Sequence, residues 1–119
     1  MNSRPVLIVE DDPDIREMLE SFLRDEGYRV SVAENGRKAL DFLRGEGDLP
    51  GLILLDLMMP IMDGRTFMGH LLQDSRLSAI PVVTLTAANI PRLDQVSDSL
   101  RKPVNIEDLL SVVSRYAQA

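Results

Sequence analysis

The stretch that decides the fold is Leu52-Ile53-Leu54-Leu55-Asp56. Four apolar residues bounded by turn signals are typical of a strand that is buried on both faces. Asp56 would then stand at the carboxyl end of that strand, which is the edge where open α/β sheets bind their ligands. The carboxylate is followed by the segment Leu57-Met58-Met59-Pro60-Ile61-Met62-Asp63-Gly64.

A second acidic group, Glu10-Asp11-Asp12, ends another apolar run, Val6–Val9. If both runs are strands of one parallel sheet, three or four carboxylates meet at one edge of that sheet. Such crowding raises the pKa values of carboxyl groups unless a cation offsets the repulsion. The two acidic groups therefore indicate a divalent-metal site built around a nucleophilic Asp56.

Strands and helices are predicted to alternate along the chain. The predicted strands are Val6–Val9, Tyr28–Val32, Leu52–Leu55, Val82–Leu85 and a weak one near Ser99–Arg101. Apolar residues at helical spacing predict four helices: one between Pro13 and Gly27, one opening at Asn35-Gly36, one after Gly64, and one from Ile106 to about Tyr116. We therefore expect one domain over residues 1–119, an α/β fold with a doubly wound, five-stranded parallel sheet and helices on both faces.

Composition narrows the classes of function. The 119 residues include 13 basic and 19 acidic ones, and the net charge of -6 argues against a nucleic-acid partner. The absence of cysteine excludes disulfides, thiol nucleophiles and zinc–thiolate sites. Because no apolar run approaches membrane-spanning length and Met1-Asn2-Ser3-Arg4 lacks a signal-peptide core, we expect a cytoplasmic location and no membrane partner.

Two further polar side chains are predicted at the same sheet edge. Val82–Leu85 leads to Thr86, and the weak last strand leads to Lys102. The predicted set, Asp11, Asp12, Asp56, Thr86 and Lys102, suits phosphoryl transfer. A carboxylate attacks phosphorus, a hard cation such as Mg²⁺ neutralises charge on the oxygens, and a hydroxyl and an ammonium take the remaining oxygens.

Four segments carry a resemblance to a known family. They are Val-Leu-Ile-Val-Glu-Asp-Asp at 6–12, Leu-Leu-Asp-Leu-Met-Met-Pro-Ile-Met-Asp-Gly at 54–64, Pro-Val-Val-Thr-Leu-Thr-Ala at 81–87 and Lys-Pro at 102–103. In this order the chain resembles, over essentially its whole length, a response-regulator receiver domain of two-component signalling, of the single-domain chemotaxis type. The resemblance implies the flavodoxin-like receiver fold. It also implies a signalling domain that assists its own phosphotransfer and dephosphorylation, not an enzyme with a separate substrate.

The resemblance also assigns roles to the site residues. Asp56 would be the phosphoacceptor, and Asp11, Asp12 and the backbone carbonyl of Met58 would help Asp56 to bind Mg²⁺. Thr86 and Lys102 would bind the phosphoryl oxygens, and the Lys102–Pro103 bond would be cis. The implied partners are a histidine kinase or phosphotransfer protein upstream and an unidentified target protein downstream.

The sequence departs from the family pattern in two places. Receivers usually carry a switch tyrosine or phenylalanine three residues before the site lysine, where this chain has Ser99. The interval between Thr86 and Lys102 is also short for a complete crossover. Since its middle, Asn89–Asp98, has poor helix-forming content, we expect the fourth helix of the family to be short, displaced or missing.

These departures leave two other functions to weigh. A receiver fold that binds a partner without phosphorylation is favoured by Ser99 and the short crossover. A Mg²⁺-dependent phosphohydrolase is disfavoured, because such enzymes commonly carry a second aspartate two residues after the nucleophile, where this chain has Met58.

Overall fold

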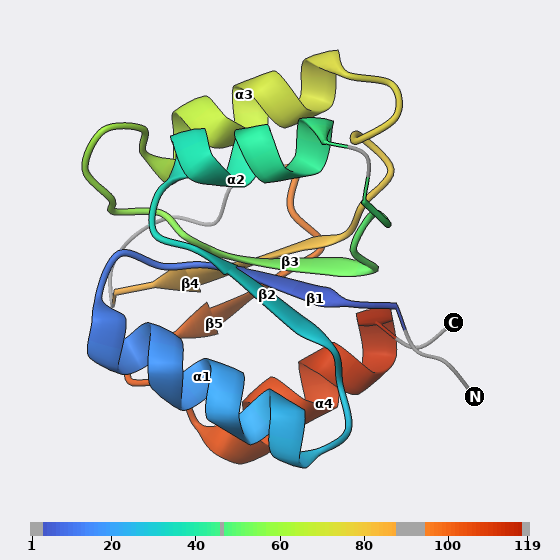
Figure 1. The fold of residues 1–119 in the computed structure, drawn as a ribbon. Helices are drawn as coiled ribbons and strands as arrows, with labels where there is room; N and C mark the ends of the chain where they lie inside the picture. The colour runs from blue at the N-terminus through green and yellow to red at the C-terminus, as the bar shows by residue number, and fades with distance from the viewer. Residues whose placement is uncertain (1–3, 46, 88–94, 118–119) are drawn as a thin grey trace.

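Five strands and four helices make up the part of the chain that this computed structural model describes, residues 4–45, 47–87 and 95–117 (Figure 1). In chain order the elements are β1 (Val6–Val9), α1 (Pro13–Asp25), β2 (Val30–Ala33), α2 (Gly36–Arg44), β3 (Leu52–Asp56), α3 (Gly64–Gln73), β4 (Val82–Thr86), β5 (Asp98–Arg101) and α4 (Ile106–Ala117). No helix among these residues is long and apolar enough to cross a membrane.

The strands form one sheet in the order β2-β1-β3-β4-β5, and every neighbouring pair is parallel. Val9 lies opposite both Ala33 and Leu55, so β1 ends level with β2 and one residue before the end of β3. The chain moves outward from β1 in both directions, which is the doubly wound arrangement. The predicted α/β class and five-stranded parallel sheet are confirmed.

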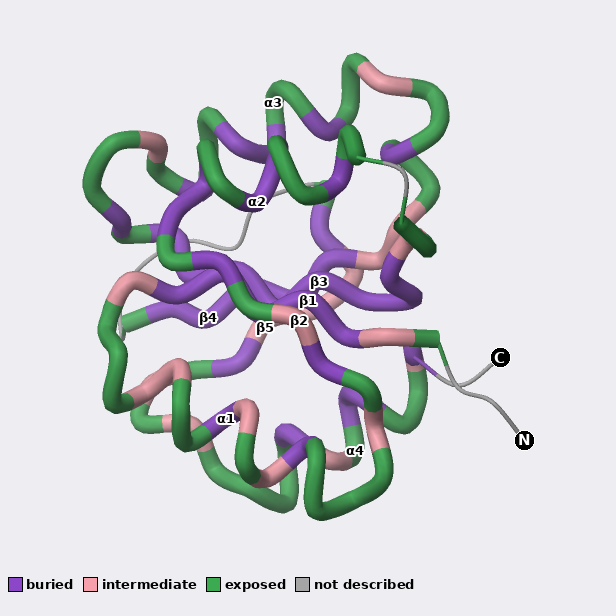
Figure 2. Tube along the Cα trace, viewed as in Figure 1, coloured by how far each residue is buried: buried purple, intermediate pink, exposed green. Residues whose placement is uncertain are grey.

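The sheet separates two hydrophobic cores. Side chains alternate along each strand, so β1 directs Leu7 and Val9 to one face and Val6 and Ile8 to the other. Helices α2 and α3 cover the first face, and α1 and α4 cover the second (Figure 1). Figure 2 shows the resulting buried layer through the centre of the molecule. β1, β3 and β4 are buried along their whole length, which explains why their residues are apolar apart from Asp56, Thr84 and Thr86.

One strand begins later than the sequence predicted. β2 runs from Val30 to Ala33, not from Tyr28 to Val32, because the chain is still completing the end of α1 at Tyr28. The amide of Tyr28 donates to the carbonyl of Leu23, and Gly27 adopts a φ of 90° that favours glycine. This turn of the chain after α1 delays the start of the strand by two residues.

The predicted irregularity between β4 and β5 falls partly outside the described residues. Residues 88–94 are not described, so the expectation of a short, displaced or missing helix within Asn89–Asp98 stays a prediction there. Residues 95–97 are described and are not helical. Val96 is buried in the core beneath α2 and α3, and the amide of Ser97 donates to the carbonyl of Val82 at 2.8 Å. These contacts fix the entry into β5.

Arg76 links the two helices on one face, and its removal should lower stability. Its Nη2 donates to the carbonyl of Leu43 at 2.8 Å and lies 3.4 Å from that of Gly45, at the C-terminal end of α2. Arg76→Met should reduce the free energy of unfolding by about 1–2 kcal/mol, because a charged donor at helix carbonyls is lost. Urea unfolding measures this.

Arg37→Met is the matched control for Arg76→Met. Arg37 is exposed in the first turn of α2, where the structure describes no hydrogen bond or ion pair for its side chain. We expect this control to leave the unfolding free energy within about 0.5 kcal/mol of the wild type. Equal losses in the two variants would contradict the role of Arg76.

Candidate functional site

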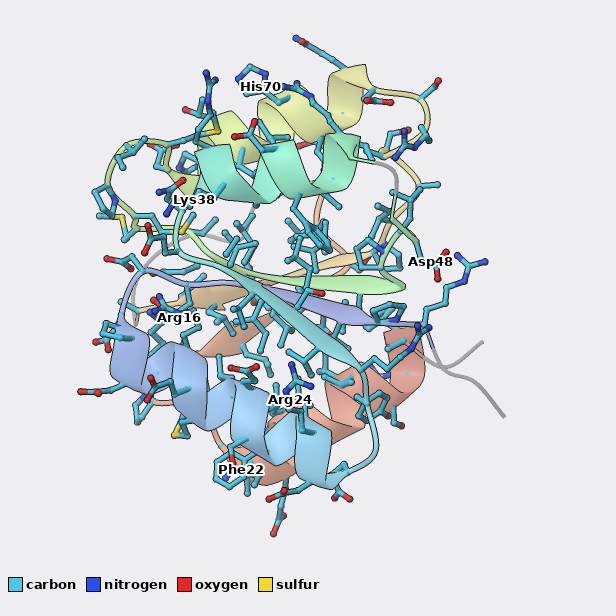
Figure 3. All side chains as sticks on the ribbon, in the orientation of Figure 1. Arg16, Phe22, Arg24, Lys38, Asp48 and His70 are labelled. Carbon is cyan, nitrogen blue, oxygen red and sulfur yellow. The ribbon has the colours of Figure 1, made fainter. Side chains whose placement is uncertain are left out.

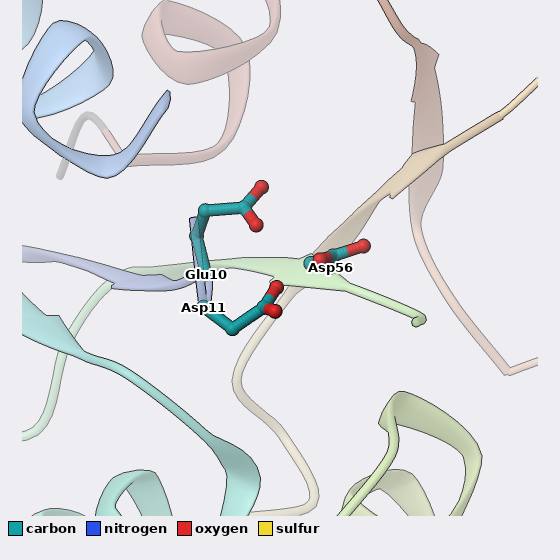
Figure 4. A group of neighbouring side chains, drawn as sticks. All are labelled: Glu10, Asp11 and Asp56. Atoms are coloured by element: carbon teal, nitrogen blue, oxygen red, sulfur yellow. The ribbon is translucent and has the colours of Figure 1, made fainter. Parts of the chain in front are cut away.

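The carboxyl edge of the sheet gathers charged side chains from three strands. Glu10 and Asp11 follow β1, Asp56 ends β3, and Lys102 follows β5. One carboxylate oxygen from each of the three acidic residues lies within 4.8 Å of those from the other two. Figure 4 shows the three carboxylates close together beyond the ends of the strands. The predicted meeting of the Glu10-Asp11-Asp12 group with Asp56 at one edge is therefore observed for Glu10 and Asp11.

Lys102 bridges two of these carboxylates. Its Nζ lies 3.1 Å from Oε1 of Glu10 and 3.3 Å from Oδ1 of Asp56. Its backbone amide donates to the carbonyl of Thr86 at 2.7 Å, which fixes the start of the Lys102 side chain beside β4. Burial alone would lower the pKa of Lys102, but its attraction to Glu10 and Asp56 raises that pKa above its ordinary value.

Asp56 is buried at the end of β3, with 3% of its surface exposed. Its Oδ1 accepts a hydrogen bond from the amide of Met58 at 3.2 Å, so the loop after β3 folds back on the carboxylate. The Met58 side chain points outward and is 70% exposed. The amide of Gly64 donates to the carbonyl of Leu57, which returns the loop to the start of α3.

Glu10 belongs to the acidic group expected at this edge, but no role in the site was predicted for it. It is completely buried, and Oε2 accepts a hydrogen bond from the amide of Asp12 at 3.2 Å. Oε1 has no aligned hydrogen bond among the described residues, although the Lys102 ammonium is near enough for an ion pair. Burial, and next the neighbouring Asp56, raise the pKa of Glu10 from 4.5 to about 7. The sequence carries a signal for Glu10, because it directly follows the apolar run Val6–Val9 just as Asp56 directly follows Leu52–Leu55.

Asp12 caps α1, and its part in binding Mg²⁺ stays a prediction. Its Oδ1 accepts hydrogen bonds from the amides of Asp14 at 2.9 Å and Ile15 at 3.3 Å, so Asp12 is the N-cap of α1. The side chain is exposed and lies outside the group formed by Glu10, Asp11 and Asp56. Pro13 at the first helical position fixes this arrangement, because proline favours the start of a helix and the residue before it takes an extended backbone.

The other predicted site residues lie at or near the edge. Thr86 is the last residue of β4 and is buried. Lys102–Pro103 is a cis peptide bond, as the resemblance implied. Ser99 is half-buried in β5 opposite Thr84, so a small hydroxyl occupies the place of the family's switch aromatic.

The roles of Asp11 and Asp12 can be separated by mutation. Asp12→Ala should lower the free energy of unfolding by about 1 kcal/mol through loss of the N-cap, while Mg²⁺ affinity stays within about twofold of the wild type. Asp11→Ala should raise the stability of the metal-free protein, because it removes one carboxylate from a crowded group of three, and should abolish Mg²⁺ binding. Thermal melts and Mg²⁺ titrations test both. If Asp12→Ala weakens Mg²⁺ binding as much as Asp11→Ala, Asp12 is a ligand after all.

The raised pKa of Glu10 predicts a pH dependence of the metal-free protein. Between pH 4.5 and about 7 the folded state binds a proton on Glu10 that the unfolded state has released. The free energy of unfolding should therefore fall as pH rises through this window, by at most about 1.4 kcal/mol per pH unit, and level off above it. Urea unfolding with EDTA at several pH values measures the slope. Glu10→Gln should remove this component, so identical pH profiles of the two proteins would contradict the assignment.

Comparisons with known proteins identify the family of this chain. The model of the response regulator receiver domain family matches residues 6–114. An uncharacterised 14.6 kDa protein of Leptolyngbya boryana is 37% identical over 120 residues, which cover 96% of this chain and 90% of the relative. Response regulator Rre1 of Synechocystis is 42% identical over 83 residues, and the match covers 69% of this chain but 35% of Rre1.

Solved structures show the same architecture. The CheY-like receiver domain protein of Methanospirillum hungatei superposes with a TM-score of 0.83 at 32% identity, covering 95% of this chain and 93% of that one. The family model extends over Glu10, Asp11, Asp56 and Lys102. The chain belongs to the response regulator receiver domain family of two-component signalling.

Proposed function

We propose that this receiver domain takes a phosphoryl group onto Asp56 from the phosphohistidine of a histidine kinase or phosphotransfer protein, in a Mg²⁺-dependent reaction. It then relays the signal by contact with a downstream protein. The observation that carries the proposal is the Lys102 ammonium held between Glu10 and Asp56, beside Asp11, at the ligand-binding edge of the sheet. A cytoplasmic location is part of the same proposal.

The acidic group fits a hard divalent cation. Three carboxylates lie within 4.8 Å of one another, and Lys102 is the cation that bridges two of them. The buried Oε1 of Glu10 also lacks an aligned hydrogen bond among the described residues. Mg²⁺ prefers oxygen ligands and keeps several waters, so Asp11, Asp56 and the carbonyl of Met58 would hold it, with Glu10 beside them. When bound, Mg²⁺ would neutralise charge on the phosphoryl oxygens.

The protein groups have distinct roles in the transfer. A carboxylate oxygen of Asp56 forms the new bond to phosphorus while the bond from phosphorus to the donor's imidazole nitrogen breaks. The electron pair of the broken bond stays on the imidazole, and Asp56 becomes an acyl phosphate. The Lys102 ammonium and the Thr86 hydroxyl donate to phosphoryl oxygens, and attack of water on phosphorus later restores the Asp56 carboxylate.

Ser99 supports one alternative function. An aromatic side chain in this place could turn inward when the hydroxyl of Thr86 moves toward a phosphoryl group, and a serine cannot fill the same space. The alternative is therefore a receiver fold that binds its partner whether or not Asp56 is phosphorylated. The two functions differ in whether phosphorylation of Asp56 controls the binding of the partner.

Phosphorylation with a small donor decides between them. Incubation with acetyl phosphate and Mg²⁺ should add the mass of one phosphoryl group to the intact protein, and EDTA should prevent the addition because the like charges at the site are no longer offset. Asp56→Asn should abolish it.

Asp63→Asn is the matched control for Asp56→Asn. Asp63 is exposed and caps α3 through a hydrogen bond from the amide of Thr66, and asparagine caps a helix equally well. This variant should be labelled like the wild type. Labelling of Asp56→Asn at the wild-type rate would refute the proposal, and a wild type that is never labelled would favour the phosphorylation-independent module.

A further inference from the structure

We propose that Arg16 positions the metal-binding carboxylates by holding the backbone that carries them; this inference rests on the proposed Mg²⁺-dependent function. Arg16 lies in the first half of α1 and is half-buried. Its Nη1 donates to the carbonyl of Glu10 at 2.9 Å and lies 3.5 Å from the carbonyl of Asp11. One guanidinium thus contacts the backbone of both acidic residues that follow β1.

The backbone at this point determines where two carboxylates point. β1 ends at Val9, so Glu10 and Asp11 stand beyond the regular strand, where the sheet no longer fixes every dihedral angle. The amide of Glu10 donates to the carbonyl of Ala33 at 3.1 Å, which anchors one side of this turn. Arg16 anchors the carbonyl of Glu10 with a charge-assisted hydrogen bond, which is stronger than one between neutral groups. Rotation of the Glu10–Asp11 peptide would redirect both side chains.

Arg16 does not act by neutralising the carboxylates directly. The pKa of Glu10 is set by burial, Asp56, Lys102 and the amide of Asp12. The Arg16 charge instead contributes to the lowered pKa of Glu34, after the larger effect of Lys38. Figure 3 shows Arg16 between α1 and the sheet, and with Val32, Ala33, Glu34 and Lys38 it lines a surface hollow beside β2. Its effect on the site therefore passes through the backbone of Glu10 and Asp11.

A second arginine on the same helix provides a matched control. Arg24 donates from Nη2 to the carbonyl of Val30 at 2.8 Å and pairs with Glu20. It therefore also joins α1 to the sheet through a backbone carbonyl, but at the start of β2, opposite the acidic edge. Loss of Arg24 should reduce stability about as much as loss of Arg16, without disturbing Glu10 or Asp11.

The experiment measures Mg²⁺ affinity by calorimetric titration of the wild type, Arg16→Met and Arg24→Met. Removal of groups that orient metal ligands typically weakens binding by about 10–100-fold, so Arg16→Met should fall in that range. Arg24→Met should stay within about twofold of the wild type. The labelling of Arg16→Met by acetyl phosphate should require a higher Mg²⁺ concentration than that of the wild type, because the variant holds the ion less tightly.

A metal-free measurement accompanies the titration. Hydrogen exchange at the amide of Asp12, which donates to Glu10, should be faster in Arg16→Met than in Arg24→Met. If Arg16→Met does not fold, Arg16→Lys replaces it, since lysine keeps the charge but cannot reproduce the planar fork of donors. Arg16→Lys should bind Mg²⁺ more weakly than the wild type.

The outcomes separate the two proposals. Wild-type protein that binds no Mg²⁺ refutes the proposed function itself. Wild-type protein that binds Mg²⁺, with an Arg16 variant that binds it equally well, refutes the role of Arg16 alone. Equal weakening in Arg16→Met and Arg24→Met also refutes it, because general destabilisation would then explain the loss.

Discussion

The site depends on one electrostatic interaction, the ion pairs that a single lysine makes with two buried carboxylates. Lys102 Nζ stands 3.1 Å from Glu10 and 3.3 Å from Asp56, which come from neighbouring strands. Removing one partner from such a buried arrangement leaves an uncompensated charge that costs several kcal/mol. The Lys102 amide donates a hydrogen bond to the Thr86 carbonyl, so β4 fixes the backbone from which the ammonium extends. The balance of charge at the site therefore depends on the positions of four strands, β1, β3, β4 and β5.

Apolar burial in the sheet offsets the unfavourable free energy of the crowded carboxylates at the site. β1 and β3, which carry the acidic residues, are buried on both faces between two separate cores. Burial of apolar side chains stabilises a fold by about 25 cal/mol per Å², whereas crowded carboxylates oppose it. Parallel pairing then brings strand ends of matched register to one edge. β1 and β3 therefore supply both the buried apolar side chains and the positions of the crowded carboxylates.

Much of this arrangement could be predicted from the sequence, because it follows from strong local signals. Apolar runs identified β1 and β3, a largely apolar run containing Thr84 identified β4, and each run led directly to a polar residue of the edge. The choice among Glu10, Asp11 and Asp12 could not be settled in this way, because a shift of one residue changes which side chains face the site. Pro13 did carry that information, since it marks Asp12 as a helix cap. The delayed start of β2 reflects hydrogen bonding at the end of α1, which apolar periodicity does not reveal.

The cap formed by Asp12 has a consequence for how this acidic run tolerates change. Serine, threonine and asparagine cap helices about as well as aspartate, so the third acid should accept any of them. Glu10 and Asp11 have no such freedom, because their carboxylates face Asp56 inside the group. Three adjacent acidic residues therefore tolerate substitution differently, because two lie in the carboxylate group at the sheet edge and the third caps the helix that begins there.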